Sequence, residues 1–367
     1  MKRVVKMIAI TGLAASALSC NDKKDDFKYL VDEFADLKIM RYQVPGWDEL
    51  SLQQKEYVYH LAEAAKYGRD IIWAQNCKYN LQIRKALENI IENYKGDRTC
   101  EEYLQFEEYA KRVFFSNGVH HHYAEDKFFP VCSKEYFGEL MEAVGAYDQR
   151  LLAFIYDYNA LPQRKTTDKT KDIVAASAVN FYEGVTKAEV EKFYADMVDP
   201  SDKTPISYGL NSKVVKGADG KIYEDVYKVG GLYGPALEKI CAELEKAAEV
   251  AENQTQKEYI ADLVAYYRSG DLRLWDSYNI KWVNDTLGTV DFVNGFVEDY
   301  NDPLGRKATW EGLVNFKDVK ASRRAELISE NAQWFEDNSP VDQRFKKAEV
   351  KGVSAKVINV ATLAGDC

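Results

Sequence analysis

WVNDTLGTVDFVNGFVEDYNDPLGRKATWEG, residues 282–312, is the stretch around which this chain is organised. Residues 289–297 have the β-branched and aromatic content of a strand. Asp291, Asn294 and Gly295, however, are residue types that central strands avoid. Residues that break a local rule often mark a functional edge. We therefore expect a strand over 289–297, with two interpretations open: an ordinary edge strand, or a strand that borders a binding site.

The next segment, EDYNDPLG at 298–305, gathers carboxylates, an amide and a phenol around an Asp-Pro turn. A cleft that holds a charged peptide terminus needs such groups. The same residues also suit a polar surface turn, so both interpretations stay open for this segment.

Size and composition predict a globular protein with more than one core. The chain has 367 residues, of which 46% are hydrophobic and 29% charged, which excludes a disordered or fibrous protein. The length is sufficient for two lobes with separate cores. The formal net charge is -10, and no basic block is interleaved with aromatic residues, so nucleic acid is not an expected partner.

The N-terminus has the pattern of a lipoprotein leader. Met1-Lys2-Arg3 is a positive start, residues 4–18 are largely apolar, and Ala17-Leu18-Ser19-Cys20 resembles a lipobox. We predict a signal peptide over 1–19, lipidation of Cys20 and a charged tether over 20–26. The expected location is the cell envelope, either lipid-anchored at the outer membrane or cell surface, or periplasmic, with the membrane contacted only through the anchor. A plain secretory signal with a chance cysteine is the alternative.

Apolar periodicity predicts an α+β fold that is predominantly α-helical. A capping-box pattern opens the expected helix at Ser51, and a second capping-box pattern, at Thr186, lies inside the helix expected over 171–197. Residues 206–215 and 221–227 flank the turn sequence GADG at 217–220 and predict a β-hairpin. The run 350–363 is apolar and is expected to be interior. The expected helices cover residues 27–42, 51–71, 79–94, 101–115, 133–156, 171–197, 234–250, 256–268 and 321–334.

Cysteine and histidine usage predicts no metal site. The five cysteines besides Cys20 form no Cys-x-x-Cys pair, so buried free thiols are expected. The four histidines are His60 and the triplet 120–122, and adjacent side chains in a strand or loop diverge too much to face one metal. We expect the triplet to contact a ligand or to pack, and His60 to lie at the surface with Glu63.

Three segments, taken together and in order, resemble the dipeptidyl peptidase III family of zinc exopeptidases. They are NGVHHHYAEDKFFP at 117–130, PISYGLNSKVVKG at 205–217 and VDFVNGFVEDYNDPLG at 290–305. The resemblance is to the bacterial, Bacteroides-type branch and to the N-terminal half of the family. It implies a two-lobed fold with a small β-barrel or sheet in the lower lobe. The lower, substrate-binding lobe is then expected over 27–311, and residues 312–367 would begin the upper zinc lobe, cut short in a fragment.

The resemblance also implies a reaction, the release of dipeptides from the N-terminus of short peptides. The family's zinc is held by a His-Glu-x-x-x-His helix and a later Glu, and that motif is absent from this sequence. We therefore expect zinc in the full-length family but no zinc, no catalytic residue and no hydrolysis in this chain alone. The alternative is a non-catalytic surface lipoprotein that binds peptide or glycan.

The same resemblance assigns candidate substrate-binding residues. Asp291 stands where the family holds the free α-amino group with an acidic side chain, a charge-assisted contact. Asn294 and Gly295 are expected to support main-chain hydrogen bonds to an extended peptide. Tyr123 and Asp126 are expected on the cleft side of the lower lobe. Animal members have a Tyr at the position of Val293, so no transition-state role is expected for this strand.

Overall fold

The structure, a computed structural model, describes residues 27–352 and 355–365 and divides the chain into two units, residues 1–43 and 44–367. The predicted signal peptide, the tether and the lipidation site Cys20 lie outside the described residues, as does Cys367. None of the helices in the described ranges has both the length and the apolar character needed to cross a bilayer.

The described part of the first unit is a β-hairpin. Strand β1 (Leu30–Phe34) pairs antiparallel with β2 (Leu37–Met40), and Phe34 lies opposite Leu37. Ala35 takes a positive φ of 50° in the turn between them. The helix predicted over 27–42 is therefore wrong. Its apolar residues at spacings of three and four are split between two strands, because a two-residue turn interrupts the run.

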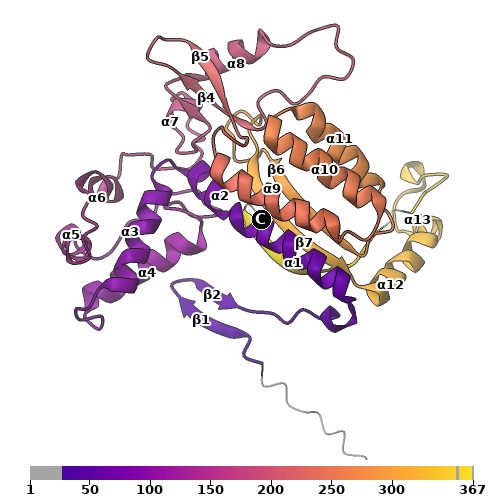
Figure 1. The fold of residues 1–367 in the computed structure, drawn as a ribbon, viewed down its shortest axis with the longest axis horizontal. Helices are drawn as coiled ribbons and strands as arrows, with labels where there is room; N and C mark the ends of the chain where they lie inside the picture. Colours follow the sequence, from indigo (N-terminus) through magenta and orange to yellow (C-terminus); the bar gives the residue numbers. More distant parts are fainter. Residues whose placement is uncertain (1–26, 353–354, 366–367) are drawn as a thin grey trace, which may run out of the picture. The chain divides into compact units, whose positions relative to one another are not determined.

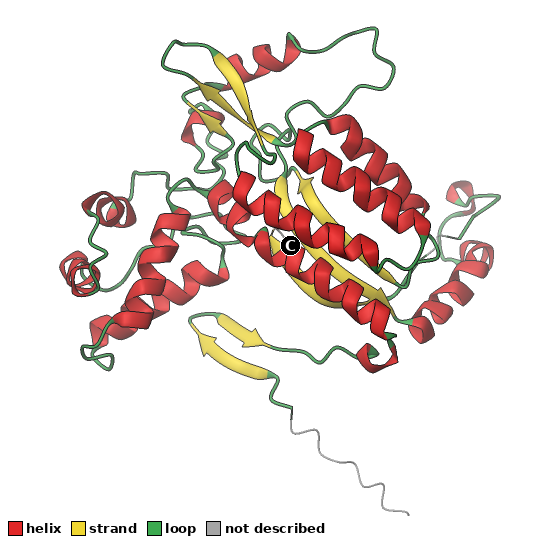
Figure 2. Ribbon diagram, viewed as in Figure 1, coloured by secondary structure: helices red, strands yellow, loops and turns green. Residues whose placement is uncertain are grey.

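The second unit contains every helix of the described residues and two sheets, which Figures 1 and 2 show. Its α-helices are α1 (Leu52–Tyr67), α2 (Arg69–Asn76), α3 (Asn80–Asn93), α4 (Glu101–Phe115), α5 (Lys134–Ala143), α6 (Gln149–Tyr156), α7 (Ile173–Ala176), α8 (Lys187–Ala195), α9 (Gly234–Glu249), α10 (Gln254–Ser269), α11 (Leu272–Asn284), α12 (Val319–Glu330) and α13 (Ala332–Asn338). Its strands are β3 (Tyr182–Glu183), β4 (Ser212–Lys216), β5 (Ile222–Val226), β6 (Val290–Glu298), β7 (Thr309–Lys317) and β8 (Ile358–Gly365), and the short 3-10 helices are η1 (Trp47–Glu49) and η2 (Gln343–Phe345).

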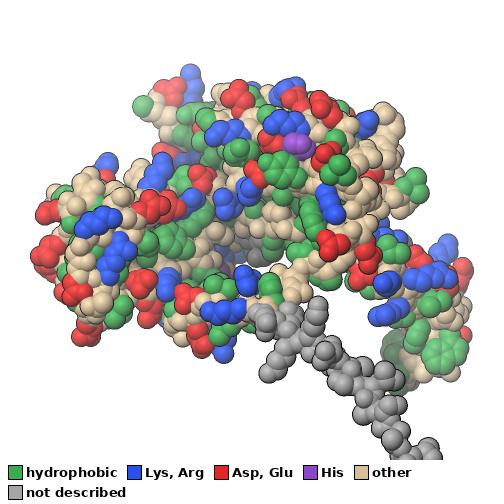
Figure 3. Space-filling view, turned by 60° about the horizontal axis from the view of Figure 1, so that its bottom comes forward, with side chains coloured by type: hydrophobic (Ala, Val, Ile, Leu, Met, Phe, Trp, Pro, Cys, Tyr) green, Lys and Arg blue, Asp and Glu red, His purple; other side chains and the backbone are tan. Residues whose placement is uncertain are grey.

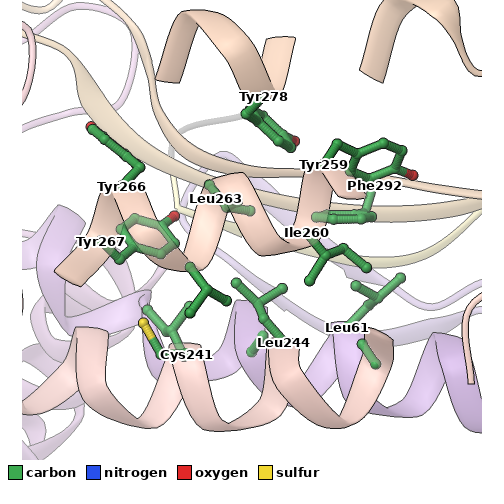
Figure 4. Close-up of a cluster of buried hydrophobic side chains, with 14 of the residues drawn as sticks. Leu61, Cys241, Leu244, Tyr259, Ile260, Leu263, Tyr266, Tyr267, Tyr278 and Phe292 are labelled. Carbon is green, nitrogen blue, oxygen red and sulfur yellow. The ribbon is translucent and has the colours of Figure 1, made fainter. Parts of the chain in front are cut away.

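The main core lies between the antiparallel sheet β6-β7-β8 and the helices α1, α9 and α10 that cross one of its faces (Figure 1). Figure 4 shows Leu61 of α1, Leu244 of α9 and Ile260 of α10 pointing toward one another. Each buried side chain of this size stabilises the folded state by about 1.5–3 kcal/mol. The sheet that carries residues 290–298 is therefore held by helices from both halves of the sequence.

A second core is mainly helical. Helices α2 to α6 enclose Phe106, Val113 and Phe137, which have no exposed surface. Two sequence predictions of this region are confirmed, the helices over 79–94 and 101–115. The helix predicted over 133–156 is divided into α5 and α6, because Gly145 takes a positive φ of 68° between them.

A third, smaller core belongs to the sheet β3-β4-β5. Strands β4 and β5 form the hairpin predicted around residues 217–220, and β3 joins β4 in parallel. The helix predicted over 171–197 is wrong over its middle, where Gly184 has a φ of 70° and residues 182–183 form β3. The predicted capping box at Thr186 is confirmed as the start of α8.

The α+β prediction is confirmed, with two open three-stranded sheets in the second unit. Among the described residues neither sheet closes into a barrel. The lobe boundary predicted between residues 311 and 312 falls inside strand β7, and the residues on either side of it pair with β6 and β8 in the same sheet.

The C-terminal run predicted as interior is wrong over its strand. Ile358, Val360 and Leu363 of β8 are 40%, 46% and 55% exposed, because β8 is an edge strand whose outer side chains meet no covering helix in the described residues. Figure 3 shows hydrophobic side chains that reach the surface at several places on one face of the molecule, among charged side chains.

Candidate functional site

The beginning of strand β6 is fixed by the connection between α9 and α10. Oε2 of Glu252 accepts hydrogen bonds from the backbone N–H groups of Thr289 and Val290, each over 2.8 Å. Nε2 of Gln256 donates to the carbonyl oxygen of Val290 over 3.2 Å. These contacts use backbone groups that the ladder leaves unpaired at an edge. They hold residue 291 in one place at the start of the strand.

Asp291 lies half-buried next to α11. Its Oδ1 accepts hydrogen bonds from Nε1 of Trp282 and from the backbone N–H of Phe292, both over 2.8 Å. Within the described part of the chain, no donor is bonded to its second oxygen, Oδ2. Burial raises the pKa of Asp291 above its usual range, while the two hydrogen bonds oppose the rise. The carboxylate of Asp291 is thus held in place through Oδ1, and Oδ2 can accept a hydrogen bond from a ligand.

Asn294 and Gly295 have internal roles in the structure. The side chain of Asn294 is 1% exposed, and its Oδ1 accepts a hydrogen bond from the hydroxyl of Tyr267 over 2.7 Å. A Cβ added at Gly295 would lie 2.4 Å from Cη2 of Trp275. The side-chain amide of Asn294 therefore bonds within the core, and the lack of a side chain at Gly295 leaves room for the indole of Trp275. A role of their main chain in peptide binding stays a prediction.

Tyr123 and Asp126 lie on the loop between α4 and α5, beside the helical core, whereas β6 belongs to the main core. Tyr123 is 86% exposed, and its backbone N–H donates to Nδ1 of His121. Asp126 pairs with Gln163 in an isolated bridge and accepts from its Nε2 over 3.3 Å. Among the described residues, no hydrogen bond or ion pair connects Tyr123 or Asp126 to Asp291. That the three residues line one cleft therefore stays a prediction.

The histidines are occupied by neighbours rather than gathered as ligands. Nε2 of His120 donates to the carbonyl oxygen of Leu161 over 2.9 Å, and burial lowers the pKa of His120 to about 4. The rings of His121 and His122 stack with centroids 4.4 Å apart. His60 pairs with Glu243 of α9 over 2.8 Å, not with Glu63. Over residues 27–352 and 355–365, no group of three or more His, Cys, Asp or Glu side chains is arranged to hold a metal ion.

The cysteine prediction holds for the described residues. Cys77, Cys100, Cys132 and Cys241 are free thiols, and three of them are buried. Burial raises the pKa of Cys77 and of Cys241 to about 11, so both stay protonated at neutral pH.

The Asp-Pro segment connects its own loop to the sheet β3-β4-β5 through Asp302. Oδ2 of Asp302 accepts from the hydroxyl of Tyr182 on β3 and from the backbone N–H groups of Arg306 and Lys307, each over 2.8 Å. Asp302 is only 4% exposed. Of the two interpretations of this segment, a polar surface turn is wrong for Asp302, which links the loop to the small sheet.

Sequence reasoning missed Lys307, which has no exposed surface. Its Nζ donates to the hydroxyls of Tyr194 and Ser212 and lies 3.8 Å from Oε1 of Glu224. Burial lowers the pKa of Lys307 to about 7, and the carboxylates of Glu224 and Asp302 oppose the fall. A lysine beside a turn is normally at the surface, so the sequence carries no signal for this position.

Helix α11 was also missed, although the sequence does signal it. Trp275, Tyr278 and Trp282 recur at spacings of three and four, which is typical of one helix face. Two of these residues meet β6 as described above, Trp275 at Gly295 and Trp282 at Asp291. The period therefore predicts which residues of α11 face the strand.

Comparison with known proteins gives the family. The model of "Peptidase family M49" matches residues 159–366, more than half of the chain. Dipeptidyl peptidase 3 of Mus musculus is 23% identical over 86% of this chain and 48% of its own length, and that of Homo sapiens is 23% identical over 86% and 49%. This chain therefore spans about half the length of these curated relatives.

Solved structures agree on the fold. The structure of DPP III from Caldithrix abyssi matches with a TM-score of 0.61 and 20% identity, over 89% of this chain and 51% of the other. Dipeptidyl-peptidase III from Corallococcus sp. strain EGB matches with a TM-score of 0.57 and 19% identity, over 88% and 50%. These matches confirm the resemblance to dipeptidyl peptidase III and its α+β fold. The chain belongs to peptidase family M49.

Proposed function

We propose that this chain is the substrate-binding part of a zinc-dependent dipeptidyl peptidase III and that Asp291 binds the free α-amino group of a short peptide. The observation that supports this most directly is the state of the Asp291 carboxylate. One oxygen is fixed by Trp282 and by the backbone of Phe292, and the other has no donor in the described part of the chain. A positioned, partly desolvated carboxylate suits an ammonium group, because charge-assisted hydrogen bonds strengthen where water is excluded.

The residues described here do not fit a zinc site. The four histidines are engaged by Glu243, by the Leu161 carbonyl and by neighbours within the 116–124 loop. No suitable cluster of ligands occurs among the described residues. We therefore place the zinc ligands in the half of the M49 fold that this chain does not span, and we assign this chain peptide binding without hydrolysis.

The first experiment measures peptide binding by isothermal titration calorimetry at pH 7. A short peptide with a free N-terminus is compared with its N-acetylated form, which lacks the positive charge. We expect the free peptide to bind at least about tenfold more tightly, since one charge-assisted hydrogen bond contributes roughly 1.5–3 kcal/mol. Asp291→Asn keeps the shape of the side chain and removes its charge, so it should abolish the preference.

Asp276→Asn is the matched control, because Asp276 is an exposed carboxylate on neighbouring α11. It should leave the preference intact. Equal binding of the free and acetylated peptides by the unmodified chain would contradict the role of Asp291.

The second experiment measures dipeptide release from a dipeptidyl-naphthylamide. The purified chain is compared with the full product of its open reading frame, each with and without added zinc. Release by the longer protein alone is the expected result. Peptide binding without release in either protein would instead support the non-catalytic lipoprotein, for which lipid attachment at Cys20 is the further requirement.

A further inference from the structure

A cavity of about 450 Å³ lies beside the sheet β3-β4-β5. Most of its wall comes from one stretch of chain, residues 174–186, which runs from α7 through β3 to the start of α8. Lys78, just before α3, and Leu161, just after α6, complete the wall. A volume of this size suits a small-molecule ligand. The candidate peptide-binding residues described above are not among the residues that line it.

Two buried side chains hold one side of the cavity in place. Nε2 of His120 donates to the carbonyl oxygen of Leu161, whose backbone takes a positive φ of 48°. Nζ of Lys127 donates to the carbonyl oxygens of three residues between 154 and 160. His120 and Lys127 are 2% and 5% exposed. They fix the loop that carries Leu161, so this wall is formed before any ligand binds, which lowers the cost of binding.

The opposite side is fixed through Asn180. Its Nδ2 donates to the carbonyl oxygen of Ala74 over 3.1 Å, and its backbone N–H donates to that of Gln75 over 2.7 Å. Nζ of Lys213 donates to Oδ1 of Asn180 over 2.8 Å and to Oε2 of Glu183. Lys213 is only 9% exposed. The carboxylate of Glu183 is therefore held at the cavity through Oε2.

The cavity carries one positive and one negative group that are not paired with each other. Within the described ranges, no donor is bonded to Oε1 of Glu183, and Lys78 forms no ion pair. Nζ of Lys78 lies 5.2 Å from the centre of the Tyr79 ring. The pKa of Glu183 is lowered chiefly by the hydrogen bond from Lys213 and further by the charge of Lys78. The two groups are thus close enough to act on one ligand.

We propose that this cavity binds a zwitterionic dipeptide, with the ammonium group on Oε1 of Glu183 and the carboxylate at Nζ of Lys78. A dipeptide carries opposite charges at its two ends, and charge-assisted hydrogen bonds are the strong ones. Its side chains would lie on the apolar part of the wall, where Val174 and Val185 are buried. A free amino acid has the same two charges, but they are closer together and it has only one side chain. The site is separate from Asp291 and does not depend on the role of that residue.

The test is an NMR titration of this chain, labelled at its valine methyl groups, with alanyl-valine. The signals of Val174 and Val185 should shift, and Val290, next to Asp291, reports separately on the candidate peptide site. We expect a dissociation constant on the order of 1 mM, because the ligand is small. Acetyl-alanyl-valine and alanyl-valine amide each lack one charge and should bind at least about fivefold more weakly. Free valine should also bind more weakly.

Two substitutions test the charged groups. Lys78→Met and Glu183→Gln should each weaken binding of alanyl-valine at least about fivefold. Lys85→Met is the control for the lysine, because Lys85 is exposed on the adjacent helix α3. Glu191→Gln is the control for the glutamate, because the side chain of Glu191 is 58% exposed, against 63% for Glu183, and is also paired with a lysine. Lys78 is at the surface, so Lys78→Met tests the site even if Glu183→Gln does not fold, which thermal unfolding would reveal.

The position of the shifted signals separates this proposal from the proposed function. Shifts at Val290 without shifts at Val174 and Val185 would overturn the cavity and leave the role of Asp291 standing. Shifts at Val174 and Val185 that persist in Asp291→Asn are expected, and they would stand even if Asp291 bound no peptide. The absence of any shift, unchanged affinity in Lys78→Met, or equal binding of free valine or of the acetylated dipeptide would also overturn the proposal.

Discussion

The indole nitrogen of Trp282 donates a hydrogen bond to Oδ1 of Asp291 over 2.8 Å. This contact joins the end of helix α11 to the start of the edge strand β6. It stabilises the ionised form of the carboxyl group against the effect of burial. The candidate ligand of the peptide terminus is thus oriented by a side chain nine residues earlier in the sequence.

Trp282→Phe removes this donor while keeping an aromatic ring. The pKa of Asp291, already raised by burial, should rise further, because one of the two hydrogen bonds that oppose the rise is lost. Peptide affinity, measured between pH 4 and 8, falls when Asp291 becomes protonated. In Trp282→Phe this fall should occur at a higher pH than in the unmodified chain. Because a raised pKa means that the folded state binds more protons than the unfolded state, stability should fall as pH rises through this window.

Trp334→Phe is the control for that experiment, since Trp334 is 60% exposed on α13. It should leave the pH profile of peptide binding unchanged. If peptide affinity falls at the same pH in Trp282→Phe as in the unmodified chain, the indole does not stabilise the ionised carboxylate.

Gly295→Ala should destabilise the protein without changing any charge. The added methyl would lie 2.4 Å from Cη2 of Trp275, so the indole or the strand must move. Overpacking of this kind costs roughly 1–3 kcal/mol. The free energy of unfolding in urea gives the measurement. Gly234→Ala is the matched control, because the nearest atom to its added Cβ lies 3.5 Å away, and it should be neutral or slightly stabilising. Equal stabilities of the two variants would contradict the packing role of Gly295.

Lys307→Met should change how stability depends on pH. Burial lowers the pKa of Lys307 to about 7, so the folded state binds fewer protons than the unfolded state above that pH. The stability of the unmodified chain should therefore rise as pH increases from about 7 towards 10, by roughly 2–4 kcal/mol. Urea unfolding at pH 6 to 10 should show this slope in the unmodified chain and in Lys203→Met, which changes an exposed lysine, but a flatter profile in Lys307→Met. The same slope in all three proteins would show that Lys307 stays charged when buried.

Local signals predicted many of the elements well. The capping boxes at Ser51 and Thr186 start α1 and α8, and the turn at residues 217–220 connects β4 and β5. Each of these signals is a contact between residues a few positions apart, so it is visible in the sequence. The strand over 289–297 was predicted for the same reason, from its β-branched and aromatic content.

The errors arose where a short break interrupts an apolar run. The helix predicted over 27–42 is instead a β-hairpin that turns at Ala35, and the helix predicted over 171–197 is interrupted at Gly184; both residues take a positive φ. The spacing of apolar residues by itself does not reveal such breaks, because a short apolar run fits either a helix or a strand.

The sequence by itself determined the α+β class, the positions of most helices and the type of residue at the candidate site, because these depend on local periodicity and side-chain chemistry. Only the tertiary structure decided what the site residues contact. Trp282 orients Asp291, Tyr267 bonds Asn294 inside the core, and Lys307 is buried against Ser212. These partners lie 9, 27 and 95 positions apart in the chain, so their meeting depends on how helices pack on the sheet rather than on any local pattern.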